Sequence, residues 1–269
     1  MALRGDLQLH STASDGLWQP EALVQGLKAA GVQVAALTDH DTCLGVPAFA
    51  ASAARAGIVA ICGAEIAAEQ DGAEVHLLSY FHALPTGPYR DILDRLSDER
   101  HGRAAKMLIQ LRRVGISLDE TQVLAQSQPG RPHVARALVA AGVVPDVPEA
   151  FERLLNPGRP GYVPRFRPAA KDVIVAAREQ GGLTSLAHPC RYEHAPLEEL
   201  TRAGIDAMEV VHPSASPAQT EMLRRTARDL GLRLVTGGSD FHAKSDDAPL
   251  GTYVLTGDDV ERFLLRLGA

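Results

Sequence analysis

The sequence has little cysteine and few aromatic residues. Its three cysteines stand at positions 43, 62 and 190, with no close pair and no CxxC spacing. This pattern excludes a disulfide framework and a cysteine-based zinc site, and it favours a reducing compartment. Aromatic residues make up 4% of the chain, too few for the broad stacking platforms of single-strand-binding proteins.

Long hydrophobic runs are also missing. Apolar stretches such as 57–64 and 137–144 fall far short of the roughly 18 to 20 residues that a membrane span needs. The opening MALRGDLQLH places charges where an export signal requires an apolar region. We therefore expect a cytoplasmic protein with no membrane partner.

The chain also lacks an excess of positive charge, since its net charge is −6. This balance argues against general adhesion to nucleic acid, so we expect no stable DNA binding. The charge is unevenly spread. Residues 84–167 carry 13 Lys and Arg against 9 Asp and Glu, whereas the remainder carries 14 against 24. An acidic frame thus contains a basic segment.

Short apolar runs alternate with amphipathic stretches along most of the chain, which predicts an α/β fold with a mostly parallel sheet, open or closed into a barrel. The predicted strands are 7–9, 34–37, 58–62, 75–80, 183–187, 208–211, 232–236 and 253–255. Predicted helices include 20–30, 46–56, 171–180 and 218–230. Glycines follow several of these helices, as helix ends prefer.

The alternation of strands and helices stops between residues 85 and 164. There the pattern predicts helices alone, at 89–114, 118–125, 132–141 and 147–155. We therefore expect an α/β core formed by residues 1–84 and 165–269. Residues 85–164 would form a helical insertion. Its excess of basic residues suggests that it caps a substrate.

Five of the ten histidines stand at the ends of predicted strands: His10, His40, His76, His188 and His242. In parallel α/β folds the carboxyl ends of the strands face one crevice, where ligands collect. Asp15, Glu65 and Asp240 occupy matching positions. Imidazole and carboxylate without thiolate select Zn, Mn or Fe. The sequence therefore predicts a site for several divalent metal ions.

Strand geometry supports particular neighbours. Asp240 and His242 are two residues apart, so an extended segment projects both from the same face, and Gly237 and Gly238 allow close backbone approach. The same spacing places Gln8 beside His10.

The segments DLQLHSTASDG, LTDHDT, GAEI, EVHLL, LAHPCRY, DAMEV and GGSDFH resemble, in order, the motifs of the PHP (polymerase and histidinol phosphatase) family. The resemblance implies a distorted (β/α)7 barrel with metals at its mouth. The residues within these motifs are most similar to those of the 3′,5′-nucleoside bisphosphate phosphatases, a branch whose relatives include 5′→3′ exoribonucleases acting on short RNA.

The resemblance further implies two to three metal ions (Mn, Zn or Fe). The implied ligand sets are position 8 with His10, Glu65 and Asp240; Glu65 with His76 and His188; and Asp15 with His40 and His242. Gln8 stands where the family has histidine, and an amide oxygen is a weaker ligand for these metals.

Other polar residues have less specific signals. Asp6, Asp39 and Asp41 are candidates to orient ligand histidines, although Asp is common in turns. Cys190 is interpreted as a small buried thiol. His82, His101 and His212 match no motif and are expected to be surface or packing residues, and His194 is a candidate substrate contact.

The predicted reaction is hydrolysis of a phosphate monoester by a metal-activated water, with His188 and Asp240 as catalytic metal ligands. Arg191 would add a guanidinium fork to the phosphate. In the insertion, Arg131, His133 and Arg136 cluster at a predicted helix start, a natural anion site.

A nucleotide with two phosphates, or the 5′ end of a short RNA, suits this layout, and the 3′-phosphate of a 3′,5′-nucleoside bisphosphate is the expected target. Two alternatives remain open. One is a phosphatase for histidinol phosphate or another small phosphate ester. The other is a non-catalytic PHP module with a metal site degraded at Gln8.

Overall fold

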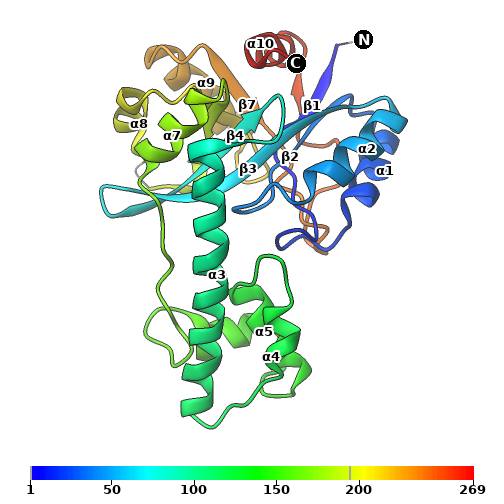
Figure 1. Cartoon of the computed structure of the whole chain (residues 1–269). Coiled ribbons are helices and arrows are strands. Elements are labelled where there is room, and N and C mark those ends of the chain that lie inside the picture. The colour runs from blue at the N-terminus through cyan, green and yellow to red at the C-terminus, as the bar shows by residue number, and fades with distance from the viewer. Residues whose placement is uncertain (1, 194) are drawn as a thin grey trace. The chain divides into compact units, whose positions relative to one another are not determined.

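A computed structural model describes residues 2–193 and 195–269 of the chain (Figure 1). These residues form two compact units. One consists of Met1–Ile92 with Arg167–Ala269, and the other of Leu93–Phe166.

The first unit is an α/β barrel, which confirms the predicted fold class. Its strands are β1 (Arg4–Asp6), β2 (Val34–Leu37), β3 (Val59–Gln70), β4 (Ala73–Phe81), β5 (Leu183–Leu186), β6 (Ala207–Val211), β7 (Leu234–Gly237) and β8 (Leu255–Thr256). They follow the order β7-β6-β5-β4-β3-β2-β1-β8. Beyond β1, Leu7 N donates to Gly237 O at 3.0 Å and Leu9 forms a bridge to Phe241. This pairing brings β1 and β7 together and nearly closes the barrel.

The barrel is distorted because β4 runs against its neighbours within the sheet, and the short edge strand β8 pairs antiparallel with β1. β4 pairs antiparallel with both β3 and β5, whereas β1, β2 and β3, and likewise β5, β6 and β7, pair in parallel. His76 therefore reaches the carboxyl end of the parallel strands from the amino-terminal half of β4. The sequence-based expectation that a mostly parallel sheet brings each histidine there as its strand ends is wrong for this residue.

Helices cover the outside of the barrel (Figure 1): α1 (Pro20–Ala29), α2 (Val46–Ala56), α7 (Ala170–Glu179), α8 (Leu197–Ala203), α9 (Pro217–Asp229) and α10 (Asp258–Leu267). Most follow the predicted ranges closely. Gly57 ends α2 in the left-handed region at φ 74°, a conformation that glycine adopts without strain.

Helix α10 packs at the end of the barrel opposite His76. Tyr80 lies four residues further along β4, and its ring meets Phe263 of α10 edge to face at 5.0 Å. The Tyr80 hydroxyl donates to Leu7 O at 3.0 Å. Val260, Phe263 and Leu267 join the same buried cluster as the strand residues. One end of the barrel is thus filled with apolar side chains, which leaves the other end for polar groups.

The second unit is helical. Helix α3 (Gly87–Arg113) extends into it and is followed by α4 (Glu120–Leu124), α5 (Arg131–Ala140), α6 (Val147–Ala150) and the π-helical turn η1 (Phe151–Leu155). Met107, Leu111, Val134 and Leu138 belong to its own buried core. No helix in the described ranges combines the length and apolar character that a membrane span requires.

Candidate metal centre

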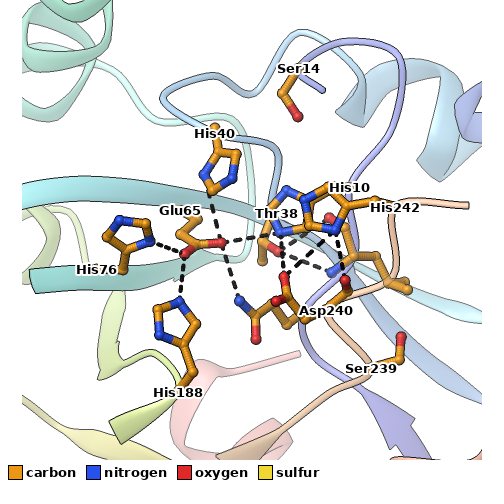
Figure 2. A network of polar contacts seen from close by, with 12 residues as sticks. His10, Ser14, Thr38, His40, Glu65, His76, His188, Ser239, Asp240 and His242 are labelled. Carbon is orange, nitrogen blue, oxygen red and sulfur yellow. Dashed lines mark hydrogen bonds and ion pairs between the residues drawn. The ribbon is translucent and has the colours of Figure 1, made fainter. Parts of the chain in front are cut away.

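The carboxylate of Glu65 on β3 lies at the centre of the polar mouth and is almost fully buried (Figure 2). Its Oε1 is 2.6 Å from His76 Nδ1 and 3.1 Å from His188 Nε2. Its Oε2 is 3.1 Å from His10 Nε2 and 3.7 Å from His40 Nδ1. One carboxylate therefore faces four imidazoles that come from four different segments of the chain.

Asp240 and Asp15 complete the arrangement. Asp240 Oδ1 is 3.3 Å from His10 Nε2 and 3.8 Å from His242 Nδ1. Asp15 Oδ1 is 3.3 Å from His242 Nε2 and 3.8 Å from His40 Nε2. The structure thus gathers the eight histidines and carboxylates that the strand-end pattern singled out.

Unusual backbone conformations hold two of these side chains. His188 and Asp240 have φ values of 33° and 50°, in the left-handed region that non-glycine residues avoid. Glu209 on β6 accepts a hydrogen bond from His188 N at 2.8 Å. Gly238 allows the segment after β7 to lie against the segment after β1, because a Cβ there would stand 2.5 Å from Gln8 N.

The centre shifts the pKa values of its groups in both directions. Burial lowers the pKa of His10, but hydrogen bonds with Asp240 and Glu65 outweigh it and raise this pKa well above its usual value, so His10 releases a proton when it coordinates a metal. Burial opposes ionisation of Glu65, but the charge of His40 and hydrogen bonds with His10, His188 and His76 hold the pKa of Glu65 well below its usual range. Burial lowers the pKa of His40 to about 3, against the opposing charges of Glu65 and Asp15. An ionised carboxylate and a neutral imidazole are the forms that coordinate metals.

Several buried nitrogen and oxygen atoms of the centre lack hydrogen-bond partners, and divalent cations would satisfy them. Ring nitrogens of His10, His40 and His188 and an oxygen of Asp15 are buried without a hydrogen-bond partner in the described part of the chain. Buried polar atoms are rarely left so unless a water or ion is missing. Three overlapping groups of ligand atoms lie close enough to hold an ion: His10, Asp15, His40 and His242; His40, Glu65 and His76; His10, Glu65 and Asp240.

These groups differ slightly from the ligand sets implied by the family resemblance. His10 joins the group around Asp15, and His40 replaces His188 in the group with His76. His188 nevertheless contacts Glu65. Because the groups share residues, ions bound in them would be close neighbours.

Gln8 lies beside this centre and is fully buried. Its Nε2 donates to Glu65 Oε2 at 3.1 Å, and its Oε1 has no partner among the described residues. The side chain is therefore in position to offer an amide oxygen or to hold the shared carboxylate.

His212 is a site residue that the sequence reasoning missed. It was expected to be an ordinary packing or surface histidine, yet its side chain is 1% exposed and its Nε2 lies 3.3 Å from Asp240 Oδ2. Ser214 N donates to its Nδ1 at 3.0 Å. The signal was available, because His212 directly follows a predicted strand, as other site histidines do.

Asp39 and Asp6 accept hydrogen bonds from nearby loops, and within the described part of the chain neither has a hydrogen bond to a candidate ligand histidine. Asp39 accepts from Ser11 N and Ser11 Oγ, both at 2.7 Å, and from Ser14 Oγ at 2.6 Å. Asp6 accepts from Ser239 N at 3.0 Å. These two carboxylates thus position the backbone of the loops that line the mouth of the barrel. His194 lies outside the described residues.

A cavity of about 510 Å³ opens over the candidate metal ligands. Its walls beyond them include Arg191, Ser214, Ser239, Lys244, Asp246 and Asp247. Arg191 Nη1 is 3.2 Å from Asp240 Oδ2, and its Nε donates to Ser214 Oγ at 3.0 Å. The guanidinium is half exposed and borders the cavity next to the predicted metal positions.

In the helical unit, the predicted anion-binding residues have different surroundings. Arg131 lies over the Phe151 ring at 5.6 Å. Arg136 is exposed in the second turn of α5. His133 is buried, and its Nδ1 accepts from Gly130 N at 3.2 Å. This hydrogen bond holds the ring against the start of α5, and the predicted phosphate contact of His133 stays a prediction.

Arg131 instead belongs to a group of arginines, Arg100, Arg103, Arg131 and Arg165. Burial and the charges of the other three lower the pKa of Arg103 to about 10. Arg103 Nε donates to Val163 O at 2.8 Å. Like charges gathered in this way form a ready site for an anion.

Comparison with known proteins agrees with this geometry. The family model described as the PHP domain matches residues 6–144. A 5′-3′ exoribonuclease from Haemophilus influenzae is 32% identical over 90% of this chain and 91% of its own. A 3′,5′-nucleoside bisphosphate phosphatase from Chromobacterium violaceum is 31% identical over 90% of this chain and 88% of its own. A solved structure from Bifidobacterium adolescentis, named as a metal-dependent phosphoesterase, superposes with a TM-score of 0.86 at 32% identity, covering 97% and 96% of the two chains.

Proposed function

The chain belongs to the PHP family and is a metal-dependent phosphoesterase, and on this premise we propose that it removes the 3′-phosphate of a 3′,5′-nucleoside bisphosphate. The observation that carries the proposal is the Glu65 centre with an arginine at the edge of its cavity. A compact cluster of carboxylates and imidazoles beside a guanidinium suits a phosphoryl group. The relatives' names support a nucleotide or an RNA 5′ end as the rest of the substrate.

Bound divalent ions would supply an activated water and neutralise charge on the phosphoryl oxygens. The residues of the chain prepare the site for this chemistry. His188 and Asp240 are proposed as ligands, each held in a left-handed backbone conformation. Arg191 contacts Asp240, so its guanidinium stands beside the ligands and can donate to phosphoryl oxygens as charge develops on them.

The helical unit carries further residues that we propose as contacts for a phosphate. We assign such a contact to Arg131 with its neighbours Arg100, Arg103 and Arg165, whose gathered positive charges favour an anion. Arg136 remains a candidate on the exposed side of α5. We also place the protein in a reducing compartment, the cytoplasm, since Cys43, Cys62 and Cys190 are free thiols.

A metal-supplemented phosphate-release screen tests the proposal. The panel contains 3′,5′-bisphosphates, simple monophosphates, histidinol phosphate and short 5′-phosphorylated RNA. The bisphosphate should be hydrolysed with the highest kcat/KM. A clear preference for histidinol phosphate or RNA would replace this assignment with that substrate.

A variant pair separates the metal centre from general effects. Glu65→Gln should lose bound metal by elemental analysis and lose phosphate release, because it removes the charge shared by four histidines. Glu179→Gln, at an exposed position of α7, is the matched control. Full metal content and activity in Glu65→Gln would contradict the proposed centre.

A further inference from the structure

Two Lys or Arg side chains, Arg191 and Lys244, line the cavity among the described residues. Arg191 comes from the turn after β5, and Lys244 comes from the loop after β7. Lys244 follows the proposed ligand His242 by two residues. Cationic groups thus enter the cavity from two separate strand ends.

Arg191 and Lys244 differ in the contacts that their charged groups already make within the protein. Arg191 contacts Asp240 and Ser214. Lys244 Nζ has no hydrogen bond or ion pair within the described ranges, and the side chain is exposed. An ammonium group on a flexible stem can turn toward an incoming anion without first leaving a carboxylate.

The backbone beneath Lys244 is firmly held. Asp247 Oδ2 accepts from His242 N at 2.6 Å and from Lys244 N at 3.0 Å. Between them Ala243 has a φ of 61°, a left-handed conformation that costs free energy for a residue with a Cβ. Strain of this kind persists where surrounding contacts impose it, and it concentrates at functional sites. The same carboxylate therefore fixes Lys244 relative to the ligand His242.

We propose that Lys244 is a phosphate-binding residue that contacts the phosphoryl group at the metal centre, together with Arg191. The inference rests on the proposed function for the identity of the substrate, but phosphate binding can be measured without turnover. The carboxylate of Asp246 also lines the cavity, so the positive charge of Lys244 would offset its repulsion of an incoming anion. The recognised chemistry is a phosphate dianion, whichever ester carries it.

Calorimetric titration of the metal-loaded protein with inorganic phosphate tests the proposal. Lys244→Ala should weaken phosphate binding about tenfold to a hundredfold, the range for a lost hydrogen bond to a charged group. Lys244→Arg should restore part of the affinity. Lys171→Ala, at an exposed position of α7, is the control and should bind as the wild type does. Metal content is measured for each variant, and the comparison uses equal loading.

Steady-state rates then locate the contact. Lys244→Ala should lower kcat/KM by a similar factor for a simple monophosphate and for a 3′,5′-bisphosphate, because both present the same reacting group. Unchanged phosphate affinity, or a loss confined to the bisphosphate, overturns the proposal. If the wild type hydrolyses no ester in the panel while Lys244→Ala still binds phosphate more weakly, the proposed function fails and the assignment of Lys244 stands.

Discussion

Asp240 Oδ2 lies 3.3 Å from the Nε2 of the buried His212, while its other oxygen, Oδ1, faces His10. The carboxylate is thus divided between two tasks. Oδ1 faces the predicted metal position, and Oδ2 contacts His212 and Arg191. Such outer contacts orient a ligand carboxylate before the metal arrives.

Replacing His212 with alanine should therefore weaken metal binding and activity about tenfold to a hundredfold, as expected for outer partners of ligands. Metal affinity, measured by competition with a chelator, is the main readout. His82→Ala, at an exposed histidine, controls for loss of an imidazole. An unchanged metal affinity in His212→Ala would show that Asp240 needs no such support.

Gln8→His should increase metal retention. The Gln8 amide lies 3.1 Å from Glu65 Oε2, so an imidazole at this position would add a stronger donor to the group with His10 and Asp240. Metal content after mild chelation should rise relative to the wild type, and turnover at limiting metal should rise with it. Gln25→His, on the exposed side of α1, provides a histidine away from the site. Equal retention in all three proteins would mean that Gln8 is already an adequate ligand.

Arg131→Ala should raise the KM for a 3′,5′-bisphosphate about tenfold or more while leaving that for a simple monophosphate nearly unchanged. The reason is that Arg131 belongs to the arginine group around Arg103. Arg136→Ala should have the smaller effect, since Arg136 is exposed. Equal losses on both substrates would assign Arg131 to general attraction or to folding of the helical unit.

Gly238→Ala should destabilise the protein and reduce its metal content together. The added Cβ would stand 2.5 Å from Gln8 N, and relieving a backbone clash of this size costs about 1 to 3 kcal/mol or more. The shift separates the Gln8 segment from Asp240. Thermal unfolding with and without metal measures both effects. Gly102→Ala, in the interior of α3 with open space around it, should instead stabilise by about 0.5 to 1 kcal/mol.

Local patterns sufficed for most of the secondary structure. The predicted strand at 34–37 is β2, and the predicted helix at 46–56 is α2. The strand follows from a short continuous run of apolar residues, and the helix follows from its apolar periodicity and from the glycine that ends it. The PHP motifs likewise predicted the family and the barrel, because they combine residue type with spacing along the chain.

The candidate site was predictable where its residues directly adjoin strands. His10 and Asp240 lie after β1 and β7, and Glu65 lies within β3 just past the part that pairs in parallel with β2, so parallel pairing brings all three to one mouth. The position of His133 was not predictable, because nothing in its local pattern shows that the ring folds back onto Gly130 N; its phosphate contact stays a prediction. His212 carried the strand-end signal but stood outside every motif.

The sequence by itself determined the elements of the fold and the chemistry of the ligands, since periodicity and residue type act over a few neighbouring positions. Only the tertiary structure decided the direction of β4, the contact between His212 and Asp240, and the place of Lys244 on the cavity wall. These features depend on strand register and loop conformation between segments far apart in the chain. Many alternative pairings would satisfy the same local preferences, and the packing of the whole barrel selects among them.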